Sequence, residues 1–118
     1  MMTVETISKR LVSLGAVVRQ ALDAVDKDDA APDELRTAVR DLAERHRDAK
    51  RRAKAVDPRI ATELVHLLEA VADRAKQAAE AADGVGASTR QAVLEAHGVI
   101  SDLESDVDAP ERHGGASS

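Results

Sequence analysis

Apolar residues recur at spacings of three and four along four segments of the chain, and polar residues fill the positions between them. This period places the apolar side chains on one face of an α-helix. The clearest segment covers residues 3–26, and the others cover residues 32–56, 58–83 and 89–107. The pattern therefore predicts four amphipathic helices of similar length.

Each segment has an apolar seam that repeats about every seven residues, as in a coiled coil. The seams are Val4, Ile7, Leu11, Leu14, Val18, Ala21, Val25; Leu35, Val39, Leu42, His46, Ala49, Ala53, Val56; Ile60, Leu64, Leu67, Val71, Ala75, Ala78, Ala82; and Val93, Ala96, Ile100, Leu103, Val107. Leu68 stands beside the third seam. The second and third seams become alanine-rich toward their ends, and we expect those ends, with the fourth helix, to form the weakest part of the core.

Helix start and stop signals separate the segments. Pro32 suits a first helical residue, and Asp57 precedes a proline and is placed to cap the third helix. The glycines in residues 84–86 stop that helix, and Ser88 with Gln91 has the spacing of a capping box.

Four amphipathic helices with short connections predict an all-α fold, an antiparallel up-down-up-down four-helix bundle. The turn before Pro58 is very short, so the second and third helices are also compatible with one long kinked helix. In that alternative the protein is a dimer of long helical hairpins. We expect residues 1–107 to form the bundle domain and residues 108–118, which lack a seam, to be a disordered tail.

The composition limits the core and several functions. The chain has 118 residues and no Phe, Tyr, Trp or Cys, and it is rich in alanine, which favours helices but buries little area. Self-association that buries more aliphatic surface is therefore expected. A chain without cysteine has no disulfide, thiolate metal site or cysteine nucleophile, which fits the cytoplasm. The Ala, Arg, Asp and Val bias suggests a bacterial source.

Charge is unevenly distributed along the chain. Residues 31–60 carry a net charge of +3, whereas residues 61–118 carry −7. The second helix holds the candidate partner-binding residues Arg45, Arg47, Lys50, Arg51, Arg52 and Lys54. Such a surface attracts an acidic protein or the phosphates of a nucleic acid, or it is a solvated face with pairs such as Asp41–Arg45 and Asp48–Arg52 at i,i+4.

Histidines supply the only candidate chemistry. His46 falls on an inward seam position, where a single hydrogen bond typically satisfies a histidine, and its burial would make the bundle sensitive to acid. Glu63 and His66 have the Glu-x-x-His spacing of di-iron bundles, but Glu95 and His97 do not repeat it. We therefore expect no bound metal or cofactor.

The sequence contains no glycine-rich elbow around a serine, no phosphate loop and no dinucleotide fingerprint, so we expect no enzyme. The leading hypothesis is a non-enzymatic helical protein–protein interaction module, such as an adaptor, a regulator or an assembly subunit, that acts through helix-face packing. The alternative is nucleic-acid or polyanion binding through the basic second helix.

Overall fold

The computed structural model describes residues 2–54 and 57–109, and all regular secondary structure among them is helical. The helices are α1 (Val4–Ser13), α2 (Gly15–Lys27), α3 (Asp33–Ala53), α4 (Pro58–Ala81) and α5 (Ala87–Asp108). The all-α prediction is thereby confirmed. None of the helices in the described part of the chain combines the length and the apolar character that a membrane crossing requires.

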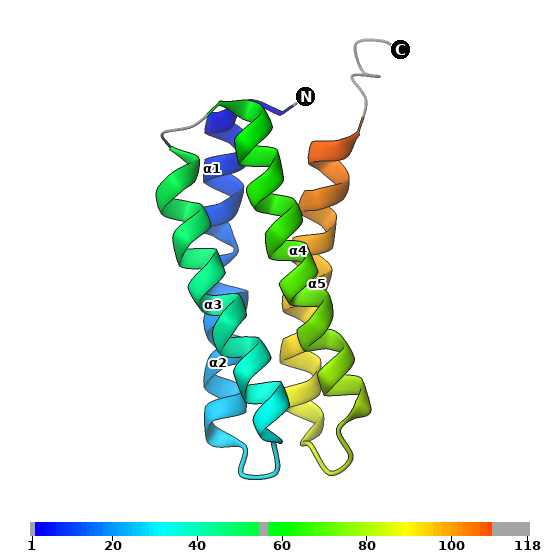
Figure 1. Cartoon of the computed structure of the whole chain (residues 1–118). Helices are drawn as coiled ribbons and strands as arrows, with labels where there is room; N and C mark the ends of the chain where they lie inside the picture. Colours follow the sequence, from blue (N-terminus) through cyan, green and yellow to red (C-terminus); the bar gives the residue numbers. More distant parts are fainter. Residues whose placement is uncertain (1, 55–56, 110–118) are drawn as a thin grey trace.

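The helices pack side by side along an elongated body of 48 × 29 × 18 Å (Figure 1). Helices α1 and α2 lie end to end, α3 packs against both, α4 packs against α3, and α5 packs against α4 and α2. Because α3 and α4 are neighbours, they do not form the single long helix that the short turn at Pro58 also allowed. Residue Val56 of the predicted second seam lies outside the described residues.

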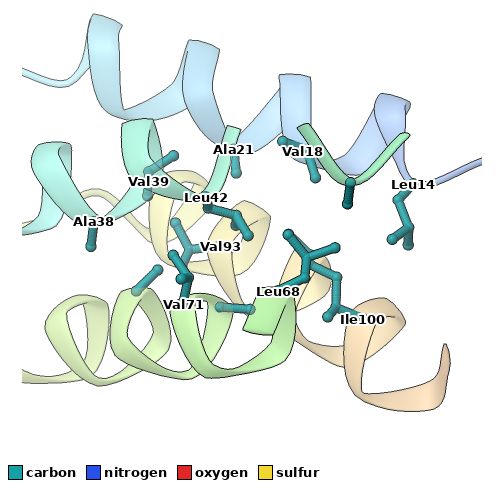
Figure 2. Close-up of a cluster of buried hydrophobic side chains, with 14 of the residues drawn as sticks. Leu14, Val18, Ala21, Ala38, Val39, Leu42, Leu68, Val71, Val93 and Ile100 are labelled. Atoms are coloured by element: carbon teal, nitrogen blue, oxygen red, sulfur yellow. The ribbon is translucent and has the colours of Figure 1, made fainter. Parts of the chain in front are cut away.

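The core is aliphatic and is shared by all the helices. Figure 2 shows side chains from α2, α3, α4 and α5 that point into the space between these helices, among them Val18, Leu42, Leu68 and Ile100. Two runs of small residues lie at opposite ends of the molecule: Ala49 and Ala53 near the end of α3, and Ala75 and Ala79 near the end of α4 (Figure 1). The expectation that the alanine-rich ends form one weak region is therefore wrong.

The first predicted helix is broken at Leu14. The Leu14 amide donates to the carbonyl oxygens of Arg10 and Leu11, at 3.2 and 3.3 Å, and the helical pattern resumes where the Val18 amide donates to the Leu14 oxygen at 3.0 Å. The Leu11 oxygen, which in an unbroken helix accepts from the Gly15 amide, instead lies 2.6 Å from Nε2 of His46. A side chain inserted into the hydrogen-bond ladder is a recognised cause of helix kinks.

The buried face of α4 differs from its predicted seam. Leu68 is 1% exposed, whereas Ile60 and Leu67 are 38% and 52% exposed. Because α4 contacts α1, α3 and α5, its buried stripe is wide and follows the 3.6-residue period of the helix. The buried residues of this stripe are Ala61, Leu64, Val65, Leu68, Val71, Ala72, Ala75 and Ala79.

The two turns at one end of the molecule are joined by Asp28. Its carboxylate accepts from the Ala30 amide within its own turn and from the Gly86 amide in the other turn, each at 3.0 Å. The Gly86 hydrogen bond is the main reason why the pKa of Asp28 is lowered. Arg90 donates from its guanidinium to the Ala82 oxygen at 2.9 Å, which ties the end of α4 to α5.

The helix ends match some of the expected signals. Asp57 caps α4, because its Oδ1 accepts from the Ile60 amide at 3.0 Å, and Gly84 has a positive φ of 85°. The predicted capping box at Ser88 is wrong, since α5 begins at Ala87 with Gly86 as its N-cap. Helix α5 also extends one residue further than expected, through Asp108. Residues 110–118 of the predicted tail lie outside the described residues.

Adjacent leucines on α4 provide a matched test of this packing. Leu68→Ala removes a buried side chain and is expected to lower the free energy of unfolding by about 2–5 kcal/mol. Leu67→Ala truncates a half-exposed side chain and is expected to cost less than about 1 kcal/mol. Urea unfolding followed by circular dichroism measures both values, and equal costs for the two variants would contradict the described face of α4.

Candidate functional site

The six candidate partner-binding residues all lie in the second half of α3 or at its C-cap, Lys54. Arg45, Arg47, Arg51, Arg52 and Lys54 are exposed, and Lys50 is half-buried. The structure does not gather them into one surface, because they point into different surroundings. Their contacts divide them into a paired group and a group that borders two grooves.

The paired group consists of three arginines that share two carboxylates of α3. Asp48 contacts Arg51 at 2.8 Å and Arg52 at 3.4 Å, and Asp41 contacts Arg45 at 3.8 Å. These are the i,i+3 and i,i+4 geometries of a solvated helix face, as expected from the sequence for two of the three pairs. Exposed pairs of this kind contribute little to stability and leave less charge for a partner.

Arg47 and Lys50 border a shallow groove of about 230 Å³ between α2 and α3. The α2 side of this groove includes Arg19 and Asp23. Within the described ranges 2–54 and 57–109, no ion pair is recorded for Arg19, Arg47 or Lys50. Three cations therefore meet at this groove beside a single carboxylate.

His46 lies at the base of the same groove and is only 4% exposed, which confirms its inward position. Its Nε2 donates to the Leu11 oxygen, since a carbonyl oxygen can only accept. Burial lowers the pKa of His46, the hydrogen bond to Leu11 opposes this shift, and the charges of Lys50 and Arg47 add to it. The ring is therefore neutral at pH 7 and holds α3 against the joint between α1 and α2.

Lys54 borders a second groove, which lies between α1 and the end of α3 and has a volume of about 780 Å³. Val12 is 56% exposed and contributes to its apolar surface. The lining residues are Val4, Glu5, Ser8, Lys9, Val12, Ser13 and Lys54. The surface of this groove is mostly apolar, and charged residues form its rim.

Helices α4 and α5 carry two polar clusters that sequence spacing did not reveal. In the first cluster His66 bonds through Nδ1 to Oε2 of Glu104, at 2.7 Å, and through Nε2 to Oδ1 of Asp108, at 2.9 Å. The hydrogen bond to Glu104 is the main reason why the pKa of His66 is raised. The partners of His66 thus come from α5, and Glu63, three residues before it on α4, is not among the contacts described for His66.

The second cluster joins Glu69 and Asp73 of α4 to His97 of α5, with Ser101 beside them. The signal for both clusters lies in polar residues that flank the seams of neighbouring helices, at positions 66, 69 and 73 of α4 and positions 97, 101, 104 and 108 of α5. Spacing within one helix cannot reveal such a site, because the ligands approach each other only after two helices have packed.

Comparison of the chain with protein-family models, with curated proteins and with solved structures finds no match in any of the three.

The buried His46 predicts a loss of stability in acid. Because its pKa is lower in the folded state than the ordinary value of 6.5, the unfolded chain binds more protons below that pH, and stability falls as the pH drops below about 6.5. His46→Gln keeps an N–H donor for the Leu11 oxygen but does not titrate. The difference in unfolding free energy between the wild type and this variant is expected to shrink from pH 7.5 to pH 5.0.

Urea unfolding at several pH values measures this difference. His66 changes the free energy of unfolding with pH in the opposite direction. Its raised pKa gives stability that is present below about pH 6.5 and is lost as the pH rises through the folded-state pKa. Both proteins contain His66, so its contribution cancels in the comparison. A difference that stays constant or grows in acid would contradict the proposed neutral state of His46, which faces Arg19, Asp23, Arg47 and Lys50.

Proposed function

We propose that the protein is a non-enzymatic helical interaction module that binds a partner helix in the groove between α1 and α3. The observation that carries this proposal is the apolar groove around Val12, which is 56% exposed and, unlike the exposed Leu67, lines a recess. A groove between two helices suits an amphipathic helix that places apolar side chains at spacings of three and four.

The charges on the rim of the groove indicate which charge its partner carries. Lys54 stands on the α3 side and Lys9 on the α1 side, and Lys9 pairs loosely with Glu5 at 4.0 Å. A partner helix with acidic residues beside its apolar stripe would meet both lysines. The charge contributes orientation and association rate, whereas burial of the apolar surface around Val12 contributes affinity.

The proposed topology is an antiparallel up-down-up-down bundle in which α1 and α2 together form the first rod. Two contacts support it. The turns around Asp28 and Gly86 meet at one end of the molecule, and Arg10 of α1 contacts Asp106 of α5 at 2.9 Å near the other end (Figure 1). A single chain then completes the core, and the hairpin dimer is not needed to bury the seams.

A charge placed in the groove tests the proposal. Val12→Glu is expected to weaken partner binding at least about tenfold, because the partner would have to desolvate a carboxylate against an apolar surface. Leu67→Glu, the same kind of change at an exposed residue of α4, is the matched control. Mass measurement in solution shows whether the occupant is a second copy, and affinity capture from the native host, quantified by mass spectrometry, compares the variants.

The expected result is a complex that survives moderate salt, is retained by Leu67→Glu and is lost by Val12→Glu. A complex that is unchanged by Val12→Glu, or lost only in Leu67→Glu, would show that the partner binds outside this groove.

A second candidate function, polyanion binding, is supported by the convergence of Arg19, Arg47 and Lys50 on one groove. Binding to duplex DNA is then expected to weaken steeply with salt. The double variant Arg47→Gln/Lys50→Gln should reduce the slope of log affinity against log salt by about 2. Fluorescence anisotropy of labelled DNA measures this slope, with Arg51→Gln/Arg52→Gln as the control, and an absence of binding at low ionic strength would exclude this function.

A further inference from the structure

The cluster around His97 brings one imidazole nitrogen close to two carboxylates and a hydroxyl group. Its Nε2 lies 3.4 Å from Oε2 of Glu69, 3.5 Å from Oδ1 of Asp73 and 3.4 Å from Oγ of Ser101. One ring nitrogen and three oxygens from two helices thus surround the same small space.

These separations are long for hydrogen bonds between charged groups, which are typically about 2.7–2.9 Å. The two distances from Nε2 to the carboxylate oxygens are close to the separation of neighbouring ligands around one tetrahedral ion, about 3.3–3.4 Å for metal–ligand bonds of about 2.0–2.1 Å. All three ligand atoms lie within 4.8 Å of one another. The cluster around His66 differs, because each of its ring nitrogens is hydrogen-bonded to a separate carboxylate, at 2.7 and 2.9 Å.

We propose that Nε2 of His97, Oε2 of Glu69 and Oδ1 of Asp73 bind one zinc-like divalent transition-metal ion. An imidazole with two carboxylates is a donor set that zinc accepts, and three protein ligands leave a fourth position for water. The two carboxylates supply a charge that balances the ion. This inference is independent of the interaction function proposed above.

The surroundings of the cluster support its ligands. The side chains of His97 and Glu69 are 15% and 21% exposed, so packing restricts both of them. Asp73 is 46% exposed and gives the ion a path from solvent. The Ser101 hydroxyl donates to Oε2 of Glu69 at 3.1 Å and orients that carboxylate, as outer hydrogen bonds do in metal sites.

Bound metal would join α4 to α5 at the middle of both helices. An ion that binds only the folded chain stabilises it, and at 100 times the dissociation constant this corresponds to a rise in Tm of roughly 10 °C for a domain of this size. The ion therefore acts as a clamp on the α4–α5 pair, whereas the Val12 groove is lined by residues of α1 and by Lys54.

The test uses the full chain without a histidine tag, stripped with EDTA. Isothermal titration with Zn²⁺ is expected to give one ion per chain, and the Zn²⁺-loaded protein should show the higher Tm. Co²⁺ provides a second readout, because its visible absorption distinguishes four-coordinate from six-coordinate sites.

Matched variants locate the ion. His97→Ala and Asp73→Asn each remove a ligand and are expected to weaken Zn²⁺ binding at least about 100-fold. His66→Ala and His113→Ala are the controls, and they should stay within about threefold of the wild type. Circular dichroism checks that each variant is helical, and Asp73→Asn decides the matter if His97→Ala does not fold.

Three results would overturn the proposal: no Zn²⁺ binding by the wild type, wild-type affinity in both His97→Ala and Asp73→Asn, or a loss that follows His66 instead of His97. Val12→Glu should bind Zn²⁺ as the wild type does, so a failure of the interaction proposal leaves this result distinct.

Discussion

The apolar side chains that are buried in the described part of the chain are no larger than leucine, and this limits the area that the core can bury. Apart from His46 and Thr89, the buried residues in the described part of the chain are Leu, Ile, Val and Ala. Polar residues on the margin of one apolar seam face the margin of the neighbouring seam. The contacts Arg10–Asp106, His66–Glu104 and His97–Glu69 each join two helices in this way.

The surface between α4 and α5 differs chemically from the surface between α1 and α3. Between α4 and α5 the margins carry histidines opposite carboxylates, and the polar clusters cover the seam. Between α1 and α3 the margin carries Val12 and Ser8, and the seam is left with an apolar recess beside it. The apolar groove and the histidine–carboxylate clusters thus belong to different pairs of helices.

The sequence predicted the helices well because each seam is long and regular, and it predicted the cap at Asp57 because that signal is local. It failed where a distant residue decided the local structure. The break at Leu14 depends on His46, and the start of α5 depends on Asp28, which binds the Gly86 amide.

The buried face of α4 was misplaced because a heptad seam assumes one neighbour, whereas α4 has three. The His97 cluster needs the register between α4 and α5, which periodicity within one helix does not contain.

The carboxylate of Asp28 connects the turn that follows α2 to the turn that precedes α5, and Arg90 connects α5 to the last carbonyl groups of α4. All these bonds lie at one end of the molecule (Figure 1). At the far end, where α1 starts and α5 stops, the helices are joined by contacts between two side chains, Arg10–Asp106 and His66–Asp108. The two ends of the bundle are therefore fastened differently: side chains hold backbone groups of the turns at one end and pair with other side chains at the other.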